Sequence, residues 1–220
     1  RNVMKKFILP LLLILTVGML AAVESEPSEV VGYVKYDVAE GYSMIAIPMT
    51  TTYTMAGDLG TALGATTVSY WNNTFQGFVA ANYIDWMDDW DNNFPITSGS
   101  VLMVNAPTAT TFYSIGNLPA TTPTYNLVVG YNTIMIPLNR SDLNMAGLVG
   151  NATNSTIVSY WNNTLQRFVA AAYYDWLGDW DNDFPTSIGN PLMVYSTSAG
   201  IFPGMKDTNN ILKNVGNTKQ

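Results

Sequence analysis

The chain of 220 residues is long enough for one large domain or two small ones, and it contains no cysteine and no histidine. Beyond residue 22 it carries all sixteen acidic residues and only six basic ones. This acidic balance argues against nucleic acid as a partner, because phosphate binding needs a basic face. The missing histidine and cysteine remove the commonest catalytic bases, nucleophiles and transition-metal ligands, so we expect a protein that is not an enzyme.

Residues 1–22 have the pattern of a secretory signal peptide. A basic start at residues 4–6 precedes an apolar run over residues 7–20, and Ala21 and Ala22 supply the small residues of a cleavage site. The run is too short to be a comfortable membrane span. We therefore expect an exported, extracellular or cell-surface protein whose fold does without disulfide bonds.

An internal repeat dominates the rest of the chain. Residues 68–95 return as residues 158–185, with 21 of 28 positions identical at a constant offset of 90. All six tryptophans fall in equivalent pairs: Trp71 with Trp161, Trp86 with Trp176, and Trp90 with Trp180. A repeat of this length predicts two copies of one structural unit.

Each copy is predicted to be mostly strand. Runs of β-branched and aromatic residues, separated by Gly, Asn or Pro, occur in both copies, and one short helical turn is expected between strands. The clearest predicted elements are strands over 30–38, 125–129, 133–136 and 156–161, helical turns over 55–63 and 145–149, and closing strands over 112–116 and 200–204. The expected fold class is all-β, with two tandem small β-sandwich or barrel-like modules.

These patterns divide the mature chain into a first copy with an N-terminal arm (23–116), a second copy (117–204) and a C-terminal tail (205–220). The segment 117–124 between the copies contains two prolines. We expect it to act as a semi-rigid spacer that sets the relative orientation of the modules.

The repeat resembles a module of secreted bacterial and archaeal surface proteins that opens with the motif GWNLISIPL. Its counterpart here is Gly-Tyr-Asn-Thr-Ile-Met-Ile-Pro-Leu at 130–138, with Tyr42 and Tyr131 where tryptophan is usual. A Tyr-Trp pair at 160–161 and an Asp-Phe-Pro turn at 183–185 follow in the same order, although the first copy has Asn93 in place of the Asp. The resemblance implies a β-rich module of surface or adhesion-like proteins and implies no activity.

An acidic segment in each copy has the alternate spacing of calcium ligands. The candidate ligands are Asp89, Asp91 and Asn93 in the first copy, and Asp179, Asp181 and Asp183 in the second. Oxygen ligands at such spacing can converge on Ca²⁺ when the loop turns tightly, but the Gly and Glu of an EF-hand are missing. A turn whose Asp and Asn side chains bond their own backbone is the favoured interpretation.

The tryptophans of the same segments are candidate contact residues. Trp86, Trp90, Trp176 and Trp180 could anchor the core, contact another subunit, or stack on the sugar rings of an extracellular glycan. Anchoring is favoured, because a small fold without disulfides needs large apolar side chains. Among functional roles a subunit contact is preferred, since tryptophan is enriched at protein–protein interfaces.

Two weaker patterns complete the candidate sites. A hydrolase using Asp85 and Asp89 is formally possible, but a catalytic pair seldom survives in both halves of a duplication. Five Asn-x-Ser/Thr sequences mark potential glycosylation sites if the source organism glycosylates exported proteins. They begin at Asn72, Asn139, Asn151, Asn154 and Asn162.

The function predicted from these patterns is that of a secreted structural protein that polymerises with itself into a filament, tube or surface layer. Head-to-tail contact between unlike module faces would give an open array. The segment 30–38, including Val30 and Tyr33, and the tail 205–220 have no evident partner in their own chain. We expect one of these two arms to pair with or pack on a neighbouring subunit. The alternative is a carbohydrate-binding or adhesion module.

Overall fold

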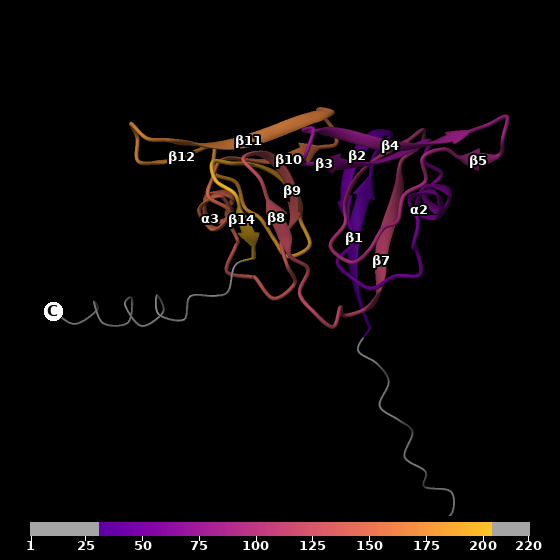
Figure 1. The fold of residues 1–220 in the computed structure, drawn as a ribbon, viewed down its shortest axis with the longest axis horizontal. Coiled ribbons are helices and arrows are strands. Elements are labelled where there is room, and N and C mark those ends of the chain that lie inside the picture. Colours follow the sequence, from indigo (N-terminus) through magenta and orange to yellow (C-terminus); the bar gives the residue numbers. More distant parts are fainter. Residues whose placement is uncertain (1–30, 204–220) are drawn as a thin grey trace, which may run out of the picture. The chain divides into compact units, whose positions relative to one another are not determined.

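The computed structural model describes residues 31–203, which belong to one compact unit (Figure 1). The predicted signal peptide, Val30 and the C-terminal tail lie outside the described residues. Within the described range, no helix is long and apolar enough to cross a membrane. The predicted all-β, two-module fold is confirmed, because each copy contains one five-stranded antiparallel sheet with a single short helix.

The sheet of the first copy has the strand order β2-β6-β3-β4-β5, with β3 at its centre. A separate two-stranded ribbon joins the first and last strands of the copy, β1 and β7. The elements are β1 (Val31–Val38), β2 (Gly41–Ala46), α2 (Ala56–Leu63), β3 (Thr67–Asn72), β4 (Gly77–Ile84), β5 (Asp89–Trp90), β6 (Val101–Ala106) and β7 (Thr110–Asn117).

The second copy repeats this topology with strand order β12-β11-β10-β13-β9 and a ribbon of β14 with β8. The elements are β8 (Tyr125–Leu127), β9 (Gly130–Met135), α3 (Ala146–Ala152), β10 (Ser155–Asn162), β11 (Arg167–Tyr174), β12 (Asp179–Asp181), β13 (Pro191–Ser196) and β14 (Gly200–Phe202). Every predicted strand and helical turn therefore has a counterpart in the fold, within a few residues.

The core of each copy lies between its sheet and its helix. In the first copy Ile45, Leu59, Val68 and Val104 are almost fully buried. Alternate residues of a strand point to opposite faces, so the partly exposed Thr67 next to Val68 lies on the sheet face away from α2. Each sheet thus has one face covered by its own helix and one face that its own module leaves uncovered (Figure 1).

A tryptophan locks each helix onto the end of its sheet. A Cβ atom at Gly57 would lie 2.8 Å from Trp90 Cγ, and one at Gly147 would lie 2.8 Å from Trp180 Cδ1. The helices carry glycine where the indole rings cross them, because any side chain there would displace the ring. The sequence Ala-Gly-x-x-Gly therefore reports close helix–tryptophan packing, which the pattern of apolar residues alone did not predict.

The expectation that β1 lacks a partner in its own chain is wrong. All eight residues of β1 pair with β7, from Val31 opposite Asn117 to Val38 opposite Thr110. The second-copy ribbon is limited to three residue pairs, with Gly200 opposite Leu127 at one end. The long β1 strand is accounted for by the equally long β7.

Candidate functional site

The two copies contact each other directly and reciprocally, and this interface positions the most distinctive clefts of the molecule. Gln166 Oε1 accepts a hydrogen bond from Tyr42 N at 2.8 Å, and Gln166 Nε2 donates to Tyr42 O at 3.0 Å. Gln76 makes the same two bonds to Tyr131, at 2.7 and 3.0 Å. Each copy thus holds the backbone of the other with the same residue in the same way.

Two indole groups reinforce this contact. Trp161 Nε1 donates to Tyr42 O at 2.8 Å, and Trp71 Nε1 donates to Tyr131 O at the same distance. Glycine precedes both tyrosines, with positive φ at Gly41 (+86°). A Cβ atom there would lie 2.7 Å from Gln166 Oε1. The glycine of the repeated Gly-Tyr sequence is therefore needed both for its backbone conformation and for the close approach of glutamine.

Two tyrosines at equivalent positions, the buried Tyr36 and the partly buried Tyr125, complete the two-fold pattern. Tyr36 Oη donates to Gly189 O, and Tyr125 Oη donates to Gly99 O, each at 2.8 Å. Burial raises the pKa of both phenols, because the charged phenolate would lose its hydration in the interface. Both side chains therefore stay neutral hydrogen-bond donors into the alkaline range, where an exposed tyrosine would ionise.

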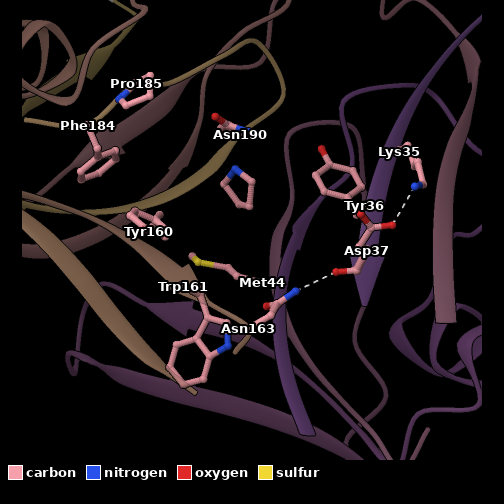
Figure 2. Close-up of a pocket in the computed structure, with 11 residues that line it drawn as sticks. Lys35, Tyr36, Asp37, Met44, Tyr160, Trp161, Asn163, Phe184, Pro185 and Asn190 are labelled. Carbon is pink, nitrogen blue, oxygen red and sulfur yellow. Dashed lines mark hydrogen bonds and ion pairs between the residues drawn. The ribbon is translucent and has the colours of Figure 1, made fainter. Parts of the chain in front are cut away.

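An equivalent cleft opens on each side of this interface. The first has a volume of about 450 Å³ and lies between β1 and the second copy, with Tyr36, Tyr160, Trp161 and Phe184 in its walls (Figure 2). Its rim contains Lys35 and Asp37, which form an ion pair at 2.9 Å. The second cleft, of about 360 Å³, is lined by the corresponding aromatic residues Tyr125, Tyr70, Trp71 and Phe94.

The direct contact changes the interpretation of the linker. The predicted semi-rigid spacer does not hold the modules apart, since a Cβ atom at Gly99 would lie 2.6 Å from Pro123 Cβ. Asn117 forms an isolated bridge with Thr50. The linker contacts both copies, since Asn139 of the second copy donates a hydrogen bond to Thr122, and the copies also share a direct interface that fixes their relative orientation.

The four candidate tryptophans fall into two groups. Trp90 and Trp180 are partly buried against the helices, as anchors. Trp86 and Trp176 lie in the turns that follow β4 and β11, and their exposed fractions are 85% and 81%. We call the turns 85–88 and 175–178 the hairpin tips. Trp176 lies 5.9 Å from the ring of Tyr174, so this tip carries two exposed aromatic rings.

The first-copy calcium candidates do not converge on a common point, because each bonds a different backbone group. Asp89 Oδ1 accepts from Trp90 N, Asp91 Oδ1 accepts from Asn82 N, and Asn93 Oδ1 accepts from Gly57 N. Only the Asp89 bond is the local one expected of the favoured interpretation, whereas Asp91 and Asn93 bond backbone groups of β4 and α2.

The second-copy carboxylates are likewise dispersed. Asp179 Oδ1 accepts from Trp180 N, whereas Asp183 Oδ1 accepts from Gly147 N at the start of α3. Among residues 31–203 no three acidic side chains lie close enough together to hold a metal ion, and this holds for Asp181 and its neighbours too. The predicted calcium sites are therefore not assembled, and Asn93 and Asp183 serve the first turns of the two helices instead.

The remaining candidate residues lie on separate surfaces. Tyr33 is 69% exposed on the β1–β7 ribbon and lies 6.2 Å from the ring of Tyr113. The equivalent Asn72 and Asn162 accept backbone hydrogen bonds within their own turns. Asn139 donates to Thr122, and Asn151 accepts a bond from Trp180.

Asn154 has a left-handed backbone with φ +50°. All five asparagines therefore belong to turns or element ends, which are common positions for glycosylation acceptors and for structural turn residues alike.

Sequence reasoning missed Gln76 and Gln166, the residues that join the copies. The available signal was their retention at equivalent positions, each two residues after the Asn-Asn-Thr turn, beside neighbours that differ. Comparison of the chain with protein-family models, curated proteins and solved structures found no match. The function must therefore be inferred from the residues themselves.

Proposed function

We propose that this protein is a secreted structural subunit that assembles with copies of itself through its two hairpin tips. The observation that carries the proposal is the near-complete exposure of Trp86 and Trp176 at equivalent positions. Exposing an indole to water is unfavourable, and exposed apolar patches on folded proteins commonly mark interaction sites. Both copies of the repeat nevertheless expose a tryptophan at this position.

The tips add further apolar surface around each indole. Met87 is 49% exposed beside Trp86, and Leu177 is 50% exposed beside Trp176. The residue types differ between the copies, but the Trp-aliphatic pair is retained. Tryptophans that become buried when two proteins associate often supply much of the binding energy of the interface.

Two equivalent tips make each chain bivalent. A bivalent subunit can contact two neighbours and so extend an open array, whereas a subunit with one site stops at a pair. The interface between the two copies within a chain cannot supply this contact, since its reciprocal two-fold pattern closes on itself. The head-to-tail module contact expected from the repeat is therefore replaced, in this proposal, by contacts at the tips.

Export follows from the sequence pattern of residues 1–22 and remains part of the proposal. The low content of charged residues, 11%, agrees with a surface suited to packing against copies of itself. Because the chain contains no cysteine, an extracellular filament, tube or layer of these subunits would be held together by non-covalent contacts.

The test is sedimentation and negative-stain electron microscopy of the mature protein and its tip variants. The wild-type protein should form large assemblies, and the double variant Trp86→Ala/Trp176→Ala should remain monomeric. Either single variant should stop at dimers, because a chain with one tip can make only one tip contact. Wild-type protein that stays monomeric over a wide concentration range would refute the proposal.

A matched control is provided by the other pair of exposed apolar side chains in the hairpin turns. Phe75 is 60% exposed between β3 and β4, and Leu165 is 51% exposed between β10 and β11. The double variant Phe75→Ser/Leu165→Ser removes comparable apolar surface away from the tips. It should assemble like the wild-type protein.

A further inference from the structure

A second candidate site lies on the first sheet, on the face away from α2. It is a groove of about 290 Å³ to which both copies contribute, and we call it the seam groove. Its lining residues are Tyr42, Thr67, Ser69, Phe78, Ala80, Met103, Trp161 and Phe168. The small residues Ser69 and Ala80 leave room on the sheet between the larger aromatic rings.

The aromatic walls of the groove are held in fixed orientations. The Trp161 indole is tied through Nε1 to Tyr42 O, and its ring meets Phe168 edge-on, with centroids 5.0 Å apart. Tyr42 and Phe78 remain 42% and 40% exposed. The groove therefore presents rings that are already oriented, so a ligand would lose little free energy in ordering them.

The lining of the seam groove contains no charged side chain. This separates it from the first inter-copy cleft, whose rim carries Lys35 and Asp37. An uncharged, aromatic lining selects a neutral ligand with an apolar face, because an ionic ligand would lose its hydration without gaining a counter-charge.

A row of polar side chains crosses the sheet through Thr67, which lines the groove, and continues outside the lining to Asn105 on one side and Asn82 on the other. Strand pairing aligns Tyr42 with Asn105, Asn105 with Thr67, and Thr67 with Asn82. Thr67 Oγ1 donates to Asn82 Oδ1 at 3.2 Å, and all three side chains beyond Tyr42 are partly exposed. Amides and hydroxyls in such a row offer both donors and acceptors to the hydroxyl groups of a ligand.

The second copy has lost this row. The aligned residues are Tyr131, Tyr195, Ile157 and Ala172, so each of the three polar residues is replaced by an aromatic or aliphatic one. The Tyr195 ring packs edge-on against Tyr131, with centroids 5.0 Å apart. The two faces thus share their aromatic residues but differ in hydrogen-bonding capacity.

We propose that the seam groove binds one ring of an uncharged glycan, with the polar row formed by Asn105, Thr67 and Asn82 contacting its hydroxyls. A pyranose has an apolar face of C–H groups and a rim of hydroxyls, which matches an aromatic groove beside an amide and hydroxyl row. An apolar side chain from another copy would use the rings but not the row. The polar row, present in one copy only, therefore favours a sugar and predicts one site per chain.

The test exchanges residues between the copies, which supply side chains already tolerated at equivalent positions. The probes are cellohexaose, mannohexaose and chitohexaose, with a galacturonic acid hexamer as the charged comparison, measured by calorimetry and tryptophan fluorescence. The wild-type protein should bind at least one neutral hexamer with a stoichiometry of one. The variant Thr67→Ile/Asn82→Ala/Asn105→Tyr should bind it at least roughly tenfold more weakly.

The reciprocal variant Ile157→Thr/Ala172→Asn/Tyr195→Asn should gain a second site. A simpler comparison is between two single variants. Ala80→Phe fills the groove, whereas the equivalent Ala170→Phe leaves the first copy unchanged. The proposal is overturned if no neutral hexamer binds, if binding survives the first triple variant or Ala80→Phe, or if the charged hexamer binds equally well. If the wild-type protein binds no sugar and the groove variants lose self-association, the groove is a contact between copies and the proposal is wrong.

Discussion

Gln166 holds the backbone of Tyr42 through both ends of its side-chain amide, with Oε1 accepting from N and Nε2 donating to O. The pair reproduces the two hydrogen bonds that facing residues of antiparallel strands exchange. Gln76 does the same to Tyr131 in the opposite direction. Because each glutamine bonds only backbone atoms of its partner, the contact requires glutamine at positions 76 and 166 but does not depend on the side chains at positions 42 and 131.

Replacing these glutamines should weaken the module interface. Gln166→Ala and Gln76→Ala should each lower the free energy of unfolding by about 0.5–1.5 kcal/mol, since both residues are exposed and the bonds are partly replaced by water. The measurement is urea unfolding followed by tryptophan fluorescence. Gln166→Glu should be at least as destabilising as alanine, because it places a second acceptor against Tyr42 O. Wild-type midpoints for both alanine variants would show that the bonds contribute nothing.

The glycine before Tyr42 should be more sensitive than another glycine with the same backbone conformation. Gly41 and Gly64 both have positive φ, but a Cβ atom at Gly64 would meet nothing within 4 Å. Gly64→Ala should therefore cost only the left-handed conformation, about 1 kcal/mol, whereas Gly41→Ala should cost more because it also displaces Gln166. Thermal unfolding of the two variants side by side makes the comparison. Equal losses would mean that the amide moves aside freely.

The two tryptophans of the first acidic segment should differ sharply in their effect on stability. Trp90 packs on α2, whereas Trp86 is 85% exposed. Trp90→Ala should lower the free energy of unfolding by about 3 kcal/mol, and Trp86→Ala should change it by less than about 0.5 kcal/mol. Equilibrium unfolding in urea, at concentrations where the chain is monomeric, measures both. A large loss for Trp86→Ala would place its indole in the fold and would remove it from the proposed assembly contact.

Substitutions of Asp183, which accepts a hydrogen bond from the first turn of α3, separate helix capping from calcium binding. Asp183→Asn should retain stability, because Asn93 makes the equivalent bond to Gly57 N in the first copy. Asp183→Ala should lower the free energy of unfolding by about 1 kcal/mol through loss of that bond. Melting temperatures measured with calcium and with a chelator provide the check. A rise in melting temperature with calcium that disappears in Asp183→Asn would support calcium binding at Asp183.

The buried phenols should make the fold sensitive to alkali. Burial raises the pKa of Tyr36 and Tyr125 above the value of about 10 expected in the unfolded chain, so the folded state binds these protons more tightly. Their contribution is complete below pH of about 10 and is lost as the pH rises toward the folded-state pKa. The double variant Tyr36→Phe/Tyr125→Phe should lose part of this decline, measured by urea unfolding between neutral and alkaline pH. A decline of the same size in both proteins would assign it to other groups.

Residue identity along the chain was enough to establish the duplication, the strand-rich composition and the order of the elements, because local propensity and turn residues act over a few neighbours. It also limited the chemistry, since the residue types are countable before any fold is known. The strand pairing of β1 with β7 and the hydrogen bonding of Gln166 to the Tyr42 backbone join residues far apart in the chain, and no local pattern specifies which distant group fills a given hydrogen bond.

Only the tertiary structure therefore separated Trp86 from Trp90, dispersed the acidic triads, and showed that Thr67 borders a groove completed by Trp161 from the other copy.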